Sequence, residues 1–472
     1  MFRHVFFHEL RLFRQNPSWW GSLLVLVLLT VAAAWNGQLR VAARSAELAD
    51  AAAAAEQMKT TLAVQLRKYE ATQDADRPPA ANAGAMGFSI LQTPASIPAR
   101  PLQPLALGQS DTLQDTYPVT AHAAYSFMNA AEIRNPNNLL AGSFDVAFVI
   151  VFVLPVFIIA LTFDLLSREK ERGLLALALA HGVALPAYTL AKCMARAAIV
   201  IGVTLAVSVA SFLVVGADIA APGALQDLLG WCIVVVLYAS LWFAIGLYVN
   251  AFSLKSETNG VLLANIWLTA VVVLPALVNV LATSAYPAPS RVTLTTELRE
   301  AATEAEQQAA EAREAYFFDH PELSDEQAPG AFFREVLASE MAIEMRIDPL
   351  LEDFERQSRE RAGVVNTLQF LSPAIVTQQA LTTIAGTDEA RYERFRQQLR
   401  EFHDVYRGFF ADRMLADQLI SSADIAQIPV FSFVETRSRW PASAITALLL
   451  ITVLLGALSL RRYRSYPILQ AT

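Results

Sequence analysis

Six apolar runs limit what this chain can fold into. Each run is 18 to 23 residues long, and a helix needs about 20 mainly apolar residues to cross the hydrocarbon core of a bilayer. Backbone groups in lipid must be paired within the protein, which a helix achieves by itself. We therefore predict an α-helical polytopic membrane protein with six transmembrane helices. The runs cover residues 18–35, 144–163, 193–215, 229–249, 261–281 and 442–460.

Composition shows that much of the chain lies outside the bilayer. Hydrophobic residues make up 54% of the 472 residues, too many for an ordinary soluble protein, yet 17% of the residues are charged. Two long inserts hold most of this charge, and residues 282–438 of the second carry 27 Asp and Glu against 15 Arg and no Lys, a net charge of −12. We expect the two inserts to fold together into one mostly helical extracytoplasmic domain.

The predicted organisation has five parts. The N-terminal part begins with an amphipathic helix of the kind that lies on a membrane surface, and a retained anchor is favoured over a cleaved signal peptide because the charged leader is long. The parts are residues 1–36 with the amphipathic helix and the first transmembrane helix, 37–143 as the first insert, 144–281 with transmembrane helices 2–5 and a charged elbow at 164–192, 282–439 as the second, acidic insert, and 440–472 with the sixth transmembrane helix and a short tail.

Within the inserts, local patterns predict helices and one irregular segment. Residues 37–73 are alanine-rich and charged and should continue the first transmembrane helix, whereas six prolines make 77–109 an irregular loop. Helices are expected at 293–318, 332–361 and 387–419, the last capped by Thr387. An aromatic and apolar stripe on this last helix should form a core; its members are Tyr392, Phe395, Leu399, Phe402 and Tyr406.

Basic residues on the short loops set the predicted orientation. They precede the first run, fill the elbow, occur in the short loop at Lys255 and follow the last run, and these positions all fall on one face of a six-span chain. The positive-inside rule makes that face cytoplasmic. Both termini and the elbow should then be cytoplasmic, and both inserts periplasmic or extracellular, in a bacterial inner (plasma) membrane.

The elbow holds the candidate functional residues. A block of alternating charge is followed by a glycine and then by an apolar helical pattern, and a solvated loop explains the basic residues but not the two glutamates or the glycine. The alternative is a docking surface for a partner. The candidate residues are Arg168, Glu169, Lys170, Glu171, Arg172, Gly173 and Leu174.

Residues 169–175, EKERGLL, resemble the E-x-E-R-G-T-L segment of ABC-2 type transporter permeases, with Leu174 where that family often has Thr. Residues 135–163 also resemble the family's approach to its second span, and there Asp145 is expected to be a helix N-cap or a first-turn carboxylate that complements the helix dipole. Residues 371–402 resemble the extracytoplasmic region of a poorly characterised ABC-2 branch; they serve as packing scaffold or receive cargo or a partner.

The resemblance implies that the chain is a permease subunit and that the direction of transport is export. It implies that the elbow is a coupling helix that contacts a cytoplasmic ABC ATPase subunit dimer, with ATP bound by that partner and no cofactor in this chain. A second permease subunit, identical or a sister, and the lipid bilayer complete the expected partners.

Several function classes are disfavoured by what the sequence does not contain. None of its 19 glycines precedes a lysine, so it has no phosphate-binding loop of its own. The spans are nearly free of ionisable residues, with Arg196 as the exception, whereas an ion-coupled transporter should carry such residues at mid-membrane. It has no G-x-S-x-G or H-E-x-x-H motif, so we assign no catalytic or metal-binding residue and expect no enzyme activity. Its acidic balance disfavours nucleic-acid binding.

Two alternatives remain open. One is a membrane-anchored sensor or assembly factor whose extracytoplasmic domain binds a partner. The other is a mechanotransmitting ABC complex, which drives that domain and moves no cargo.

Overall fold

The computed structural model describes residues 2–72, 77–108, 114–128, 144–180, 184–214, 223–287, 296–304, 307–308, 331–435 and 440–466. Within them, six helices are long and apolar enough to cross a membrane, which confirms the predicted helical membrane protein. The helices are α1 Phe2–Gln15, α2 Pro17–Thr72, α3 Ala83–Ala85, α4 Ala124–Met128, α6 Val146–Phe148, α7 Leu154–Thr162, α8 Ser167–Glu171, α9 Leu174–Ala180, α10 Leu185–Val214, α11 Ala224–Asn250, α12 Ser256–Trp267, α13 Leu274–Ala285, α15 Ala331–Leu368, α16 Pro373–Ala385, α17 Glu389–Leu415 and α18 Ala442–Tyr463.

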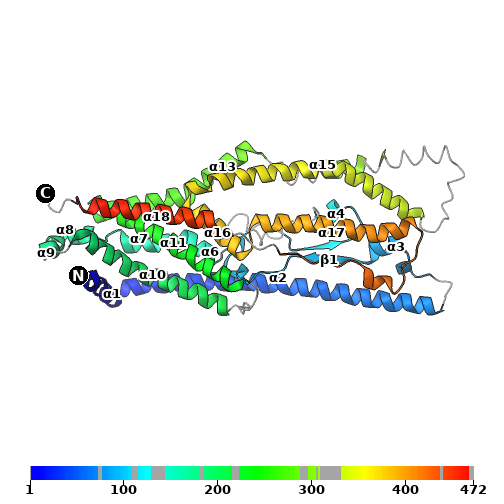
Figure 1. The fold of residues 1–472 in the computed structure, drawn as a ribbon, viewed down its shortest axis with the longest axis horizontal. Helices are drawn as coiled ribbons and strands as arrows, with labels where there is room; N and C mark the ends of the chain where they lie inside the picture. The colour runs from blue at the N-terminus through cyan, green and yellow to red at the C-terminus, as the bar shows by residue number, and fades with distance from the viewer. Residues whose placement is uncertain are drawn as a thin grey trace.

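The molecule is elongated, with a helical bundle at one end and a second domain at the other (Figure 1). Helix α1, the elbow helices α8 and α9 and the end of α18 lie together at the bundle end, and most of α17 lies in the second domain, which we call the distal domain. Helix α2 passes from the bundle into the distal domain without a break, as the sequence predicted. At 1.5 Å per residue its 56 residues extend about 84 Å.

Helix α11 lies at the centre of the bundle core. Trp231, Tyr238 and Trp242 are fully buried on it, and it packs against α7, α10, α16 and α18. The Tyr238 hydroxyl donates to the carbonyl of Val151 at 2.8 Å. That carbonyl lies four residues before Pro155, which has no N–H to offer it, so the tyrosine supplies the missing donor.

The two prolines within the spans are accommodated by π-helical turns. The turn Val149–Val153 precedes Pro155, and the turn Leu268–Val273 precedes Pro275. A wide turn of this kind absorbs the steric conflict of a proline within a helix. Both spans therefore continue as helices past the residues that interrupt their apolar runs.

The distal domain combines both inserts, as predicted. One apolar core contains Leu62 and Leu66 of α2, Phe88 of the first insert and the α17 stripe. Tyr392, Phe395, Leu399 and Tyr406 are buried there, and Phe402 is half-buried. The backbone N–H of Ile420 donates to the carbonyl of Ala81 at 2.9 Å and joins the inserts directly.

Three expectations for the inserts need correction or completion. The proline-rich segment contains strand β1 Thr93–Ser96, which pairs antiparallel with β2 Thr116–Val119 and sets Pro94 opposite Pro118. Two strands alone have free edges, where proline is tolerated. Thr387 does not cap α17: Asp388 is the N-cap residue, without a capping side-chain bond, and the Thr387 hydroxyl donates to the carbonyl of Ala106 at 2.9 Å. Parts of the helix expected at 293–318 lie outside the described residues.

Helix α16 joins the second insert to the bundle. Its N-cap Ser372 accepts from the N–H of Ile375 and donates at 2.6 Å to the carbonyl of Ala270 in the fifth span. Apolar residues of α16, including Leu381 and Ile384, belong to the bundle core. Ser372 and Pro373 therefore begin a helix that packs against α11, and this helix fixes the distal domain to the bundle.

Candidate functional site

The elbow consists of two short helices separated by a glycine turn. Helix α8 ends at Glu171, and α9 begins at Leu174. Between them Gly173 has a φ of +72°, in the left-handed region, and its N–H donates to the carbonyl of Lys170 at 3.0 Å. No atom lies within 4 Å of where a Cβ at Gly173 would stand. The glycine is therefore needed for its backbone conformation and not for lack of space.

The three central residues of the elbow face other helices. Glu169 accepts from the ammonium of Lys192 at 2.7 Å and from the hydroxyl of Tyr188 at 2.9 Å, both on α10. The ammonium of Lys170 donates to the hydroxyl of Ser253, just after α11. These contacts attach α8 to two membrane helices.

Glu171 attaches α8 to a third helix. Its carboxylate accepts from the backbone N–H of Ser256 at 2.7 Å. Ser256 is the first residue of α12, and the N-cap residue Lys255 makes no capping side-chain bond there. Glu171 therefore satisfies a free N–H at the start of α12, where a negative charge also complements the helix dipole.

A buried ionic cluster lies beneath the elbow. The guanidinium of Arg196 donates to Glu9 at 2.7 and 2.8 Å and lies 3.5 Å from Asp164. Glu9 and Arg196 are 3% and 6% exposed, and the guanidinium lies 4.8 Å from the ring centre of Trp19. Because a lone buried charge is costly, this pairing is what allows Arg196 to lie inside the bundle.

The remaining candidate residues lie on the surface of the elbow. Arg168, Arg172 and Gly173 are exposed, and Leu174 is 52% exposed. Arg168 also pairs with Asp164 at 2.7 Å, which places it above the ionic cluster. The elbow thus presents two arginines and an apolar side chain outward, while Leu175 is buried against the bundle.

Sequence reasoning missed the anchoring partners. Glu9 occupies a position on the apolar stripe of α1, spaced as Phe2, Phe6, Glu9 and Phe13, and a charge on such a stripe signals a buried partner. Asp164 and Tyr188 lay within the elbow range but were given no role. Helix α10 begins at Leu185 and includes Lys192, so the third helix extends beyond the apolar run into residues expected to belong to the elbow.

Comparison with protein-family models gives a match in the second insert. Residues 291–434 match the family model of a domain of unknown function, DUF3526. The match covers less than a third of the chain and falls within the second insert. A search of curated proteins found no match.

Proposed function

We propose that this chain is the membrane subunit of an ATP-driven ABC-2 type transporter, an exporter whose ATP is hydrolysed by a separate cytoplasmic subunit. The observation that carries the proposal is the construction of the elbow: an outward surface of Arg168, Arg172 and Leu174, supported by polar bonds to several membrane helices. A partner that pushes on this surface moves α10, α11 and α12 together. The resemblance of residues 169–175 to the permease coupling segment supports the same reading.

In this proposal the elbow end lies in the cytoplasm and the distal domain outside the inner membrane. The basic residues near α1, in the elbow and after α18 support this orientation. A second permease subunit, identical or a sister, completes the transport path within the bilayer. The chain itself contributes no catalytic residue.

The test is co-purification of an ATPase with the tagged protein from native membranes. Leu174→Glu places a charge on the outward elbow surface, and we expect it to reduce the recovered ATPase at least tenfold. Leu225→Glu is the matched control, because Leu225 is 59% exposed near the start of α11, at the opposite end of the bundle. Equal recovery with both variants contradicts the docking assignment.

Gly173→Pro probes the same surface through the backbone. Proline fixes φ near −65° and has no N–H, so it removes both the left-handed turn and the bond to the Lys170 carbonyl. We expect the variant to insert in the membrane and to lose the ATPase. If no ATPase accompanies even the wild type while external proteins do, a sensor or assembly factor becomes the better description.

One observation favours the mechanotransmitting form of the proposal. Helix α2 contributes Leu23 and Leu26 to the bundle core and Leu62 and Leu66 to the distal core. A single helix shared by both cores transmits a tilt of the bundle directly to the distal domain. Hydrogen exchange in the distal domain that changes during ATP hydrolysis, with no cargo present, would support this form.

A further inference from the structure

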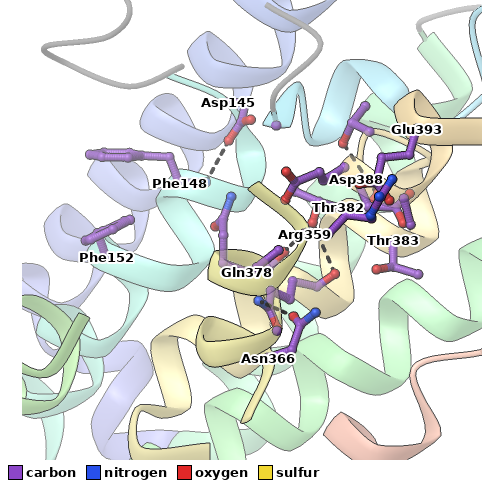
Figure 2. Close-up of a pocket in the computed structure, with 17 residues that line it drawn as sticks. Asp145, Phe148, Phe152, Arg359, Asn366, Gln378, Thr382, Thr383, Asp388 and Glu393 are labelled. Carbon is purple, nitrogen blue, oxygen red and sulfur yellow. Dashed lines mark hydrogen bonds between the residues drawn. The ribbon is translucent and has the colours of Figure 1, made fainter. Parts of the chain in front are cut away.

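A cavity of about 870 Å³ lies where the bundle meets the distal domain (Figure 2). It is lined by the start of the second span and by α15, α16 and the first turn of α17. Its volume falls within the range of sites that hold drug-sized molecules. The elbow plays no part in it, so it is a separate site.

Aromatic side chains form one wall of this junction cavity. Phe148 and Phe152 stack with ring centres 4.9 Å apart and planes 27° apart. Figure 2 shows both rings on one side, and Asp388 and Glu393 on the other. Because the aromatic pair belongs to the membrane span, the apolar wall lies on the membrane side of the cavity.

The opposite wall is lined by carboxylates whose charged forms the surrounding protein compensates only in part. Within the described part of the chain, neither Glu389 nor Glu393 makes a salt bridge. Burial raises the pKa of both Asp388 and Glu389, although Arg394 near Asp388 and Arg361 near Glu389 oppose the shift. The nearest basic lining residue, Arg359, pairs with Glu355 at 3.9 Å.

An ordinary structural role accounts for only part of this charge. Acidic residues in a first turn complement the helix dipole, but that dipole amounts to about half an elementary charge. A dipole of this size does not compensate the charges of three carboxylates, and burial keeps the pKa values of Asp388 and Glu389 raised in its presence. Asp145, a fourth carboxylate, is already engaged as the N-cap predicted from the sequence: its oxygens accept from the N–H groups of Phe148 at 2.7 Å and Leu107 at 2.8 Å.

A polar atom between the two walls also lacks a partner. The side-chain carbonyl oxygen of Gln378 is buried and accepts no hydrogen bond within the described part of the chain. Figure 2 places Gln378 between the phenylalanines and the acidic group. A buried acceptor without a donor is costly, so it is a position where an N–H of a bound molecule would be favourable.

We infer that the junction cavity binds an organic cation with an apolar body, held between the Phe148–Phe152 pair and the α17 carboxylates. Aromatic faces and carboxylates both favour positive charge. Within the described residues, no three metal-binding side chains converge, which favours an organic cation over a metal ion. This inference rests on the proposed transport function, for which the cation is the class of ligand carried or sensed.

The test measures binding of tetraphenylphosphonium to the full-length protein in lipid nanodiscs, with empty nanodiscs subtracted. Tetraphenylborate, of similar shape and opposite charge, is the comparison probe. We expect the wild type to prefer the cation, and Glu389→Gln with Glu393→Gln to weaken cation binding about tenfold while leaving anion binding unchanged or stronger. Phe148→Leu should also weaken cation binding, because it removes an aromatic face and keeps apolar volume.

The matched control removes the same charge elsewhere on the same helix. Glu401 and Asp404 are exposed on α17 away from the cavity, and Glu401→Gln with Asp404→Asn should bind the cation like the wild type. Equal losses in both double variants would show a general surface-charge effect and overturn the inference. So would a wild type that binds both probes equally.

Recovery of the ATPase is scored in the same preparations, which separates this inference from the proposed function. Cavity-dependent cation binding without an ATPase supports the site and contradicts the transporter. An ATPase without cavity-dependent binding supports the transporter and contradicts the ligand assignment.

Discussion

The elbow and the distal domain, at opposite ends of the molecule, are each stabilised by a different kind of interaction. At the elbow, Glu169, Lys170 and Glu171 fix a five-residue helix through hydrogen bonds and ion pairs to neighbouring helices. In the distal domain, the ring of Phe395 lies edge-on to those of Phe431 and Phe433 within a continuous apolar core.

This difference is physically informative. Polar bonds define direction and partner but contribute modestly to stability, whereas buried aromatic area contributes several kcal/mol per side chain. An element fixed mainly by polar bonds keeps its orientation relative to several helices and moves with them. A domain fixed by an aromatic core keeps its own shape when it is displaced.

The largest expected effect is on the distal core. Phe395 is fully buried, and Phe395→Ala should lower the stability of the distal domain by about 3–5 kcal/mol through lost burial and a cavity. Hydrogen exchange of the α17 amides in the full-length protein measures this loss. Phe370→Ala is the control: Phe370 is 45% exposed, and its removal should cost under about 1 kcal/mol.

If the comparison holds, the Phe395 variant changes exchange in the distal domain and leaves the elbow protected. Increased exchange in α8 and α10 as well would mean that the two ends unfold together and that the contrast between them is wrong.

The buried ionic cluster should give the next effect. Arg196→Leu leaves Glu9 buried without its partner, which should destabilise the bundle by about 3–5 kcal/mol. Thermal unfolding of the protein in detergent measures the loss. The double variant Glu9→Gln with Arg196→Leu removes both charges and should recover much of it.

A double variant no more stable than Arg196→Leu would show that packing of the arginine against Trp19, and not charge pairing, is the main contribution.

Arg196 also shows what the sequence can and cannot reveal. Apolar runs located the six helices that, within the described residues, are long and apolar enough to cross a membrane. The third was predicted to begin at residue 193, whereas α10 begins at Leu185. Hydropathy treats each side chain alone. It cannot account for a carboxylate 187 residues away, or for the elbow carboxylate that pairs with Lys192.

The candidate site was predictable to a similar extent. The order of charge, glycine and apolar residues located a short elbow between two apolar runs, but it did not predict the left-handed φ of +72° at Gly173. The partners of Lys170 and Glu171 lie after α11 and at the start of α12, and no local pattern links these segments. The junction cavity joins Gly108 of the first insert to side chains of the second insert and of one span, so it has no sequence signature.

A smaller effect is expected at Gly173. Gly173→Ala forces an L-residue into the left-handed region, at a cost of about 1–2 kcal/mol. Because the surrounding space is empty, this cost falls on the turn alone, and we expect reduced coupling of ATP hydrolysis with little change in melting temperature. Gly202→Ala is the control, since Gly202 also has open space around it but lies inside α10. Equal coupling in the two variants would argue against a role for the turn.

The smallest expected effect is a pH dependence of the stability of the distal domain, which tests how far a polar pair helps to join the two inserts. His122 of the first insert lies 2.7 Å from Glu340 of the second. The hydrogen bond that His122 donates to Glu340 raises the pKa of His122 above its usual 6.5. Burial opposes ionisation of Glu340, yet hydrogen bonds from His122 and from the N–H of Ala123 hold the pKa of Glu340 below its usual 4.5.

The pKa shifts of His122 and Glu340 together define the pH range in which the pair stabilises the fold. The raised His122 pKa stabilises the fold fully below about pH 6.5, and this contribution is lost as pH rises through the raised value. The lowered Glu340 pKa stabilises the fold fully above about pH 4.5, and this contribution is lost as pH falls. The pair should therefore contribute most between pH 4.5 and 6.5, by at most about 1 kcal/mol because His122 is partly exposed.

The pKa of His403 is shifted in the opposite direction to that of His122, so a variant is needed to isolate the contribution of the His122–Glu340 pair. Burial lowers the pKa of His403, and its contribution is lost as pH falls below about 6.5. The stability difference between the wild type and Glu340→Gln cancels that background. We expect this difference to be larger at pH 5.5 than at pH 8, measured by hydrogen exchange in α15 and α17. A difference that does not change with pH would mean that the His122–Glu340 pair does not help to join the two inserts.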